Sequence, residues 1–169
     1  NTQEPLFIVN RPGNVPSHSG SADSIDKAIG VCREAGFEEV RVRGDTDFAL
    51  TKNFDRWNAN GTKFVFGIDS TELLVDLAEF LPEAAYAELV RQLPYEVKTA
   101  PRAKRNNVKD EVVKAREFTK MTLTGEQLTE FPYQPGACTE PYRIVALRKD
   151  ISVTKGERTL LPEVRFFFY

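Results

Sequence analysis

The segment from Val40 to Asp47 constrains the fold more than any other part of this chain. A short β-branched strand ends there in Gly-Asp-Thr-Asp, directly after an amphipathic helix. In open α/β sheets, reactive groups lie just beyond the carboxyl ends of the strands. Asp45 and Asp47 are expected at such an edge, where carboxylates suit a divalent metal such as Mg²⁺. The alternative is a simple turn, in which Asp45 or Asp47 caps the next helix.

The first half of the chain alternates strands with helices. Alternation of this kind predicts an α/β fold with parallel pairing in a buried sheet. Asp23 or Ser24 is expected to cap the first helix, and Phe54 and Trp57 to pack a short helix against the sheet. Asp47 is expected to have a structural role, as the cap of the helix that contains Phe54. The expected strands are 6–9, 39–43 and 63–67, and the expected helices are about 23–35, 51–60 and 70–80.

The second half of the chain is dominated by strand patterns. Turn-rich pieces separate them, which is typical of antiparallel sheets. A length of 169 residues fits one domain with an insertion. We therefore expect a core over residues 1–94 and a β-rich insertion over residues 95–169. The expected strands of the insertion are 95–99, 120–124, 142–148 and 164–169.

Charge is unevenly distributed along the chain. Residues 98–120 hold eight basic and three acidic residues, whereas residues 1–97 hold nine basic and sixteen acidic ones. The basic stretch either contacts DNA phosphates or forms a solvated face with pairs such as Asp110 and Lys114. The residues expected to contact DNA are Lys98, Arg102, Lys104, Arg105 and Lys109.

Several other features restrict the class of protein. Cys32 and Cys138 form no metal-binding spacing, so we expect a reducing cytosol rather than a disulfide framework. No apolar run approaches the length of a membrane span, and no signal peptide is recognised. His18, the single histidine, is expected in a surface loop rather than as a general base. Arg11 and Asn14 either face the site or stabilise a turn.

Four motifs stand in order along most of the chain: Asn10-Arg11-Pro12-Gly13-Asn14, Arg43-Gly44-Asp45-Thr46-Asp47-Phe48, Phe64-Val65-Phe66-Gly67, and Tyr95-Glu96-Val97-Lys98-Thr99-Ala100-Pro101-Arg102-Ala103. Together they resemble bacterial insertion-sequence transposases of the DDE type. The resemblance implies an α/β fold in which an RNase H-like mixed sheet with flanking helices is interrupted by an antiparallel β-rich insertion.

The resemblance also implies a chemistry. The family uses two Asp and one Glu to hold two divalent metal ions, Mg²⁺ or Mn²⁺, for phosphodiester cleavage and strand transfer at the ends of the element. Asp45 takes the place of the second Asp. The first Asp and the Glu fall outside this sequence, so a fragment that binds little Mg²⁺ and is inactive alone is expected. The implied partners are double-stranded DNA, at transposon ends and target, and a second copy on that DNA in the bacterial cytoplasm.

Two other functions stay open at this point. Asp45-Thr46-Asp47 after a strand imitates the paired acids of haloacid dehalogenase-like phosphatases, although Arg41 and Arg43 interrupt the strand. A non-catalytic DNA- or protein-binding domain derived from a transposase fits the same residues. Finding an Asp upstream and a Glu downstream in the parent protein would favour the enzyme over the non-catalytic binding domain.

Overall fold

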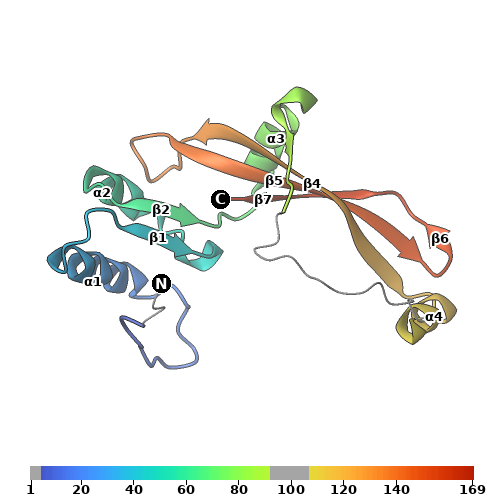
Figure 1. Cartoon of the computed structure of the whole chain (residues 1–169), viewed down its shortest axis with the longest axis horizontal. Helices are drawn as coiled ribbons and strands as arrows, with labels where there is room; N and C mark the ends of the chain where they lie inside the picture. The colour runs from blue at the N-terminus through green and yellow to red at the C-terminus, as the bar shows by residue number, and fades with distance from the viewer. Residues whose placement is uncertain (1–4, 92–106) are drawn as a thin grey trace, which may run out of the picture. The chain divides into compact units, whose positions relative to one another are not determined.

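The computed structural model describes residues 5–91 and 107–169. The fold is mixed α/β, as predicted (Figure 1). The chain divides into two compact units, and each draws on separate stretches of sequence. The first unit comprises Asn1–Thr71, Glu130–Val145 and Phe167–Tyr169, and the second comprises Glu72–Thr129 and Ala146–Phe166. The domain boundary expected at residue 94 lies outside the described residues and stays a prediction.

A parallel pair of short strands organises the first unit. β1 (Arg41–Gly44) pairs with β2 (Lys63–Phe66), so that Arg41 lies opposite Lys63 and Gly44 opposite Phe66. Beyond β2, Ile68 forms an antiparallel bridge with Phe168. Because β1 and β2 run in the same direction, their carboxyl ends meet at one edge, and the predicted parallel pairing is confirmed.

Two α-helices and two 3₁₀ turns belong to this unit. They are α1 (Ser21–Glu34), η1 (Thr46–Phe48), η2 (Thr51–Asn53) and α2 (Phe54–Ala59). The predicted cap of the first helix was wrong. α1 begins at Ser21, after Gly20 at φ 71°, and no side chain caps it. Ser24 lies inside the helix, where its hydroxyl donates to the Gly20 carbonyl at 3.3 Å.

Aromatic side chains of α2 and β2 form the core of the first unit. Phe54 and Trp57 are buried, and the Trp57 ring stacks on Phe66 at a centroid distance of 5.7 Å. Phe54 lies 4.6 Å from Phe64, again between ring centroids. Burial of each such ring stabilises the fold by about 1.5–3 kcal/mol. The predicted packing of the short helix against the strands is confirmed.

The strand expected at residues 6–9 is absent. These residues have no strand conformation, and Ile8 is 89% exposed. An apolar run forms a strand only where a neighbour accepts and donates its backbone hydrogen bonds. No described strand does so here, and a sequence pattern gives no information about such a partner.

The second unit contains most of a larger sheet. Its strand order is β3-β4-β5-β6, and β7 also pairs with β5. β4 and β5 are far longer than the strands predicted within them, whereas the strand expected at 95–99 lies outside the described residues. The elements are α3 (Glu72–Glu79), η3 (Glu83–Ala85), β3 (Ala87–Glu88), α4 (Val108–Ala115), β4 (Thr119–Tyr133), β5 (Tyr142–Lys155), β6 (Arg158–Thr159) and β7 (Glu163–Phe168).

An arginine holds several elements of the second unit together. The guanidinium of Arg148 lies 4.4 Å from the centroid of the Tyr86 ring and pairs with Glu83. The Tyr86 hydroxyl donates to the Ala78 carbonyl at 2.7 Å, which links the segment after η3 to α3. The pKa of Glu83 lies below its ordinary value because Arg148 donates hydrogen bonds to it.

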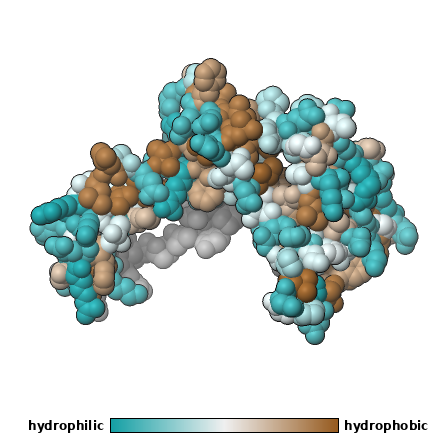
Figure 2. All heavy atoms as spheres, turned by 180° about the vertical axis from the view of Figure 1, so that it is seen from behind, coloured by the Kyte–Doolittle hydropathy of each residue, from teal (hydrophilic) through white to brown (hydrophobic). Residues whose placement is uncertain are grey.

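On the face that Figure 2 shows, groups of hydrophobic side chains lie between hydrophilic ones. None of the described helices has the length and apolar character needed to cross a membrane.

Candidate functional site

The candidate site lies where β1 ends. Asp45 is the first residue after β1 and is exposed. Its backbone carbonyl accepts a hydrogen bond from the Phe48 amide at 3.2 Å, which closes the turn η1. Its carboxylate makes no cap hydrogen bond and has no partner among the described residues. The segment is therefore a turn, but the Asp45 side chain does not stabilise it.

Two glycines allow the chain to pass closely around Asp45. A Cβ atom on Gly44 would lie 2.8 Å from the Phe66 ring, and one on Gly67 would lie 3.1 Å from the Thr46 backbone nitrogen. The Gly67 amide donates to the Gly44 carbonyl at 3.2 Å. The segment that follows β2 is thus held against the turn that carries Asp45, and side chains at either glycine would push the two apart.

Asp47 is engaged differently from Asp45. The Ser17 hydroxyl donates a hydrogen bond to the Asp47 carboxylate and joins the loop before α1 to η1. The expected capping role of Asp47 was wrong, because α2 begins after Asn53 and no side chain caps it. Two 3₁₀ turns separate Asp47 from that helix. Ser17 was not predicted as a site residue, since it lies 30 residues away in the sequence.

A cavity of about 330 Å³ adjoins the site between α1 and β1. Arg43 lines it from β1, Asp45 from the turn after β1, and Ser21 and Ser24 from α1. Phe48 contributes part of its apolar wall. The hollow beside the end of β1 is therefore mainly apolar, with Asp45 and Arg43 among the residues that line it.

Ion pairs occupy the opposite end of the two strands. Glu39 pairs with Arg41 and with Lys63, which begin β1 and β2. Hydrogen bonds from Arg41 and then Lys63 hold the pKa of Glu39 below its ordinary value. Glu39 thus shares its carboxylate between two cations at the amino ends of the strands, whereas Asp45 at the carboxyl end forms no ion pair with the described residues.

The residues described do not complete a metal site. Among 5–91 and 107–169, no group of three or more His, Cys, Asp or Glu side chains is placed to hold a metal ion. Asp45 can supply one hard oxygen ligand of the kind that Mg²⁺ and Mn²⁺ prefer. One carboxylate does not bind such an ion against water, so further ligands would be needed.

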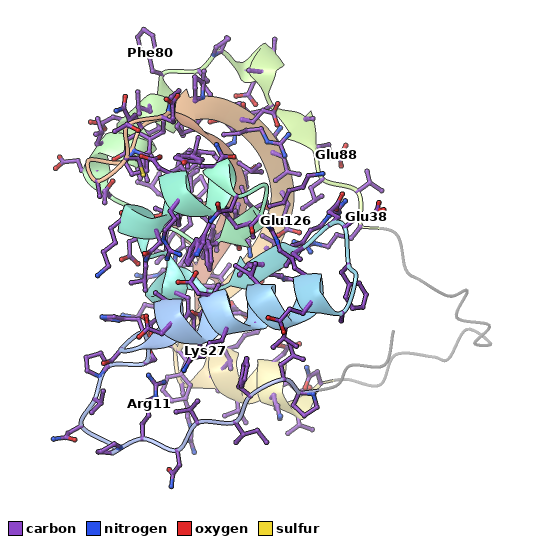
Figure 3. All side chains as sticks on the ribbon, turned by 90° about the vertical axis from the view of Figure 1, so that its left-hand side faces the viewer. Arg11, Lys27, Glu38, Phe80, Glu88 and Glu126 are labelled. Atoms are coloured by element: carbon purple, nitrogen blue, oxygen red, sulfur yellow. The ribbon has the colours of Figure 1, made fainter. Side chains whose placement is uncertain are left out.

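The loop before α1 is held by its own hydrogen bonds. The Arg11 guanidinium donates to the carbonyls of Pro16 and Ser19, at 3.3 and 2.8 Å, and Figure 3 shows its side chain within this segment. These contacts match the turn interpretation of Arg11. His18 is exposed in the same loop, as predicted, and its carbonyl accepts from the Ser21 amide at 3.0 Å. Asn14 is also exposed.

Four of the five predicted DNA-contacting residues lie outside the described residues, namely Lys98, Arg102, Lys104 and Arg105. Lys109 is exposed in the first turn of α4, whose N-cap Asn107 accepts from the Lys109 amide at 3.1 Å. Asp110 pairs with Lys120 at 2.7 Å, rather than with Lys114 as the solvated-face alternative suggested. This ion pair links α4 to the start of β4.

Comparison with protein-family models, with curated proteins and with solved structures finds no match to this chain.

Proposed function

We propose that this chain is part of the catalytic domain of a bacterial DDE transposase, with an RNase H-like core interrupted by a β-rich insertion. The observation that carries the proposal is the position of Asp45. It follows the first strand of a parallel pair directly, at the edge where α/β enzymes place reactive groups. The motif resemblance assigns the second catalytic acid to the same residue.

The contrast between the two acids supports Asp45 over Asp47. Both acids are exposed, but the Asp47 carboxylate accepts a hydrogen bond from Ser17, whereas the Asp45 carboxylate has no partner among the described residues. A metal ligand needs an oxygen that faces solvent or substrate, and Asp45 meets that requirement. Asp47 instead fixes the loop that precedes α1.

The bound ion in this proposal is Mg²⁺ or Mn²⁺. It would activate the attacking water or hydroxyl group and stabilise the oxygen that leaves phosphorus. The proposal places the other two acids of the triad on segments outside this sequence, so the chain's own part is to present Asp45 at the strand end. The proposed partner is double-stranded DNA, contacted through the basic stretch around Lys98 to Lys109.

The test uses the full-length parent protein, its own element ends and Mg²⁺. Strand cleavage is compared for wild type, Asp45→Asn, Asp47→Asn and Ser17→Ala, with DNA affinity and thermal unfolding measured for each variant. We expect Asp45→Asn to abolish cleavage while DNA affinity and stability stay near wild type. Asp47→Asn and Ser17→Ala, as matched controls, are expected to retain cleavage.

The other outcomes discriminate between functions. Full cleavage by Asp45→Asn would show that this carboxylate belongs only to a turn. Equal loss with Asp47→Asn would point to a shared acidic site. DNA binding without any cleavage by the wild type would favour a non-catalytic binding domain, and hydrolysis of p-nitrophenyl phosphate by the present chain alone would favour a phosphatase.

A further inference from the structure

Over residues 5–91 and 107–169, the outer edge of β4 is open at its first residues. One side of β4 pairs with β5, whereas β3 covers the other side only at Gln127 and Leu128. Of the residues described, none pairs with this outer edge between Thr119 and Gly125. Every residue from Thr119 to Thr124 is exposed. Open strand edges are templates for pairing with another chain.

The hydrogen bond between β3 and β4 shows which backbone groups face outward. The Leu89 amide donates to the Glu126 carbonyl at 2.9 Å, so the backbone groups of Glu126 face the outer edge. Backbone groups alternate in direction along a strand. The N–H and C=O groups of Lys120, Thr122 and Thr124 therefore point outward as well.

We propose that this edge, Thr119–Gly125, pairs antiparallel with the same edge of a second copy, about a two-fold axis at Thr122. Thr122 then lies opposite Thr122 of the second copy, and Lys120 lies opposite Thr124. Each of these pairs exchanges two backbone hydrogen bonds, because all the residues involved direct N–H and C=O outward. A self-complementary patch of this kind gives a closed dimer.

The side chains of the edge are complementary in this register. Met121 falls opposite Leu123 at a position between the hydrogen-bonded pairs, where facing side chains are closest. Both side chains are about half exposed in the single chain, at 52% and 51%. Pairing would bury Met121 of each copy against Leu123 of the other, so the two-fold symmetry gives two such contacts.

Charge does not oppose the pairing. Lys120 is the single charged residue from Thr119 to Gly125, and a lysine usually guards an open edge. Here its ammonium group lies 2.7 Å from the Asp110 carboxylate of α4, so its charge is compensated within the chain. Its partner position in the dimer is the neutral Thr124, and no like charges face each other.

The neighbouring registers are less favourable. A shift toward the start of β4 that centres the axis on Lys120 would place two lysines directly opposite each other. A shift that centres the axis on Thr124 would set Met121 opposite Gln127, whose outer edge is already taken by Glu88 of β3. The register about Thr122 is thus the one in which apolar residues meet and no outward backbone group is already bonded to another described residue.

Sedimentation velocity of the chain over a range of concentrations tests the pairing. We expect a concentration-dependent dimer in which Thr122→Pro weakens association by about tenfold or more, because it removes two hydrogen bonds of the pair. The Thr122 amide does not bond to β5, so proline is tolerated there as at other strand edges. Thr122→Val keeps the amide and is expected to dimerise like wild type.

A charge pair at Thr124 tests the register even if the proline variant fails to fold. Thr124→Lys would face Lys120 of the second copy, and Thr124→Glu would face it with opposite charge. Both variants lose the same hydrogen bond to the Asp150 carbonyl, so they are matched in the single chain. We expect the dissociation constant of Thr124→Lys to be about threefold or more above that of wild type, and that of Thr124→Glu to be about threefold or more below it.

Two results would overturn the proposal. One is a chain that stays monomeric at every concentration measured. The other is a dimer whose dissociation constant is unchanged in Thr122→Pro and equal in the two Thr124 variants, which would place the interface elsewhere. The inference does not depend on Asp45 or on DNA, so its failure leaves the proposed function unaffected.

Discussion

The Tyr142 hydroxyl donates a 2.6 Å hydrogen bond to the Asp55 carboxylate, across 87 residues of sequence. The second carboxylate oxygen accepts from the amide and the hydroxyl of Thr139, at 2.7 and 2.8 Å. Asp55 lies in the first turn of α2. Thr139 belongs to the connection between β4 and β5, and Tyr142 is the first residue of β5. One carboxylate therefore fastens that connection to α2 within the first unit.

The Asp55 contacts predict a dependence of stability on pH. Hydrogen bonds from the Thr139 amide and the Tyr142 hydroxyl hold the pKa of Asp55 below its ordinary value. Because the folded-state pKa is depressed, this stabilisation is present above about pH 4 and is lost as the pH falls through the folded-state value. Asp55→Asn should therefore lower the melting temperature at neutral pH and reduce its fall below pH 4.

The matched control for this experiment is Asp76→Asn. Asp76 is exposed on α3, and its carboxylate accepts no hydrogen bond from the described residues, so its loss should leave the pH profile of unfolding near that of wild type. Thermal melts from pH 7 to pH 2 make the comparison. Parallel profiles for wild type and Asp55→Asn would contradict the assigned role of the carboxylate.

Truncating Trp57 should be among the most damaging single changes in the first unit. The side chain is 1% exposed, stacks on Phe66 and donates to Asp26 at 2.7 Å. Trp57→Ala is expected to cost about 3–5 kcal/mol, because it leaves a cavity in the aromatic cluster and removes the hydrogen bond to Asp26. Chemical denaturation followed by circular dichroism measures the loss.

Val65 supplies the control for Trp57. It lies on β2 beside Phe66 but is 54% exposed, so Val65→Ala should change the free energy of unfolding by less than about 1 kcal/mol. A similar cost for the two substitutions would mean that the aromatic cluster is not the main source of stability in this unit.

A methyl group added at Gly44 should lower the stability of the fold, because this residue is tightly packed at the candidate site. Its Cβ would lie 2.8 Å from the Phe66 ring and 3.1 Å from Phe48 Cβ, closer than packed atoms allow. Gly44→Ala is expected to cost about 1–3 kcal/mol through overpacking. Gly13→Ala, where no atom lies within 4 Å of the new Cβ, should change stability by less than about 0.5 kcal/mol.

Local patterns predicted the elements whose partners are close in sequence. The strands β1 and β2 and the helix α2 with Phe54 and Trp57 follow from apolar spacing and turn residues. The position of Asp45 after β1 follows from the same spacing. These elements were predictable because a single stretch of residues sets both their conformation and the face that they bury.

Contacts between distant residues were beyond the reach of the same reasoning. Ser17 meets Asp47, and Tyr142 meets Asp55, through tertiary packing that no local spacing encodes. The apolar run from Leu6 to Val9 had the composition of a strand but lacks a described strand beside it. Asp47 was misassigned as a cap because the spacing of apolar residues does not reveal the two 3₁₀ turns that precede α2.

The DNA-contact hypothesis for the basic stretch predicts a change in salt dependence. If Arg102, Lys104 and Arg105 each neutralise a phosphate, every lost contact should flatten the slope of log affinity against log salt concentration by about 0.9. Binding of the full-length parent protein to its element ends, measured by fluorescence anisotropy across salt concentrations, gives this slope. Replacing all three residues with Ala should therefore weaken binding most at low salt.

A second triple variant controls for net charge. Lys27, Lys52 and Lys155 are exposed and lie outside the basic stretch, so their replacement with Ala removes the same three charges. We expect that variant to keep a slope near wild type, because distant surface charges are screened within about 10 Å at 0.1 M salt. Equal slopes for both triple variants would mean that residues 98–120 act as an ordinary solvated face.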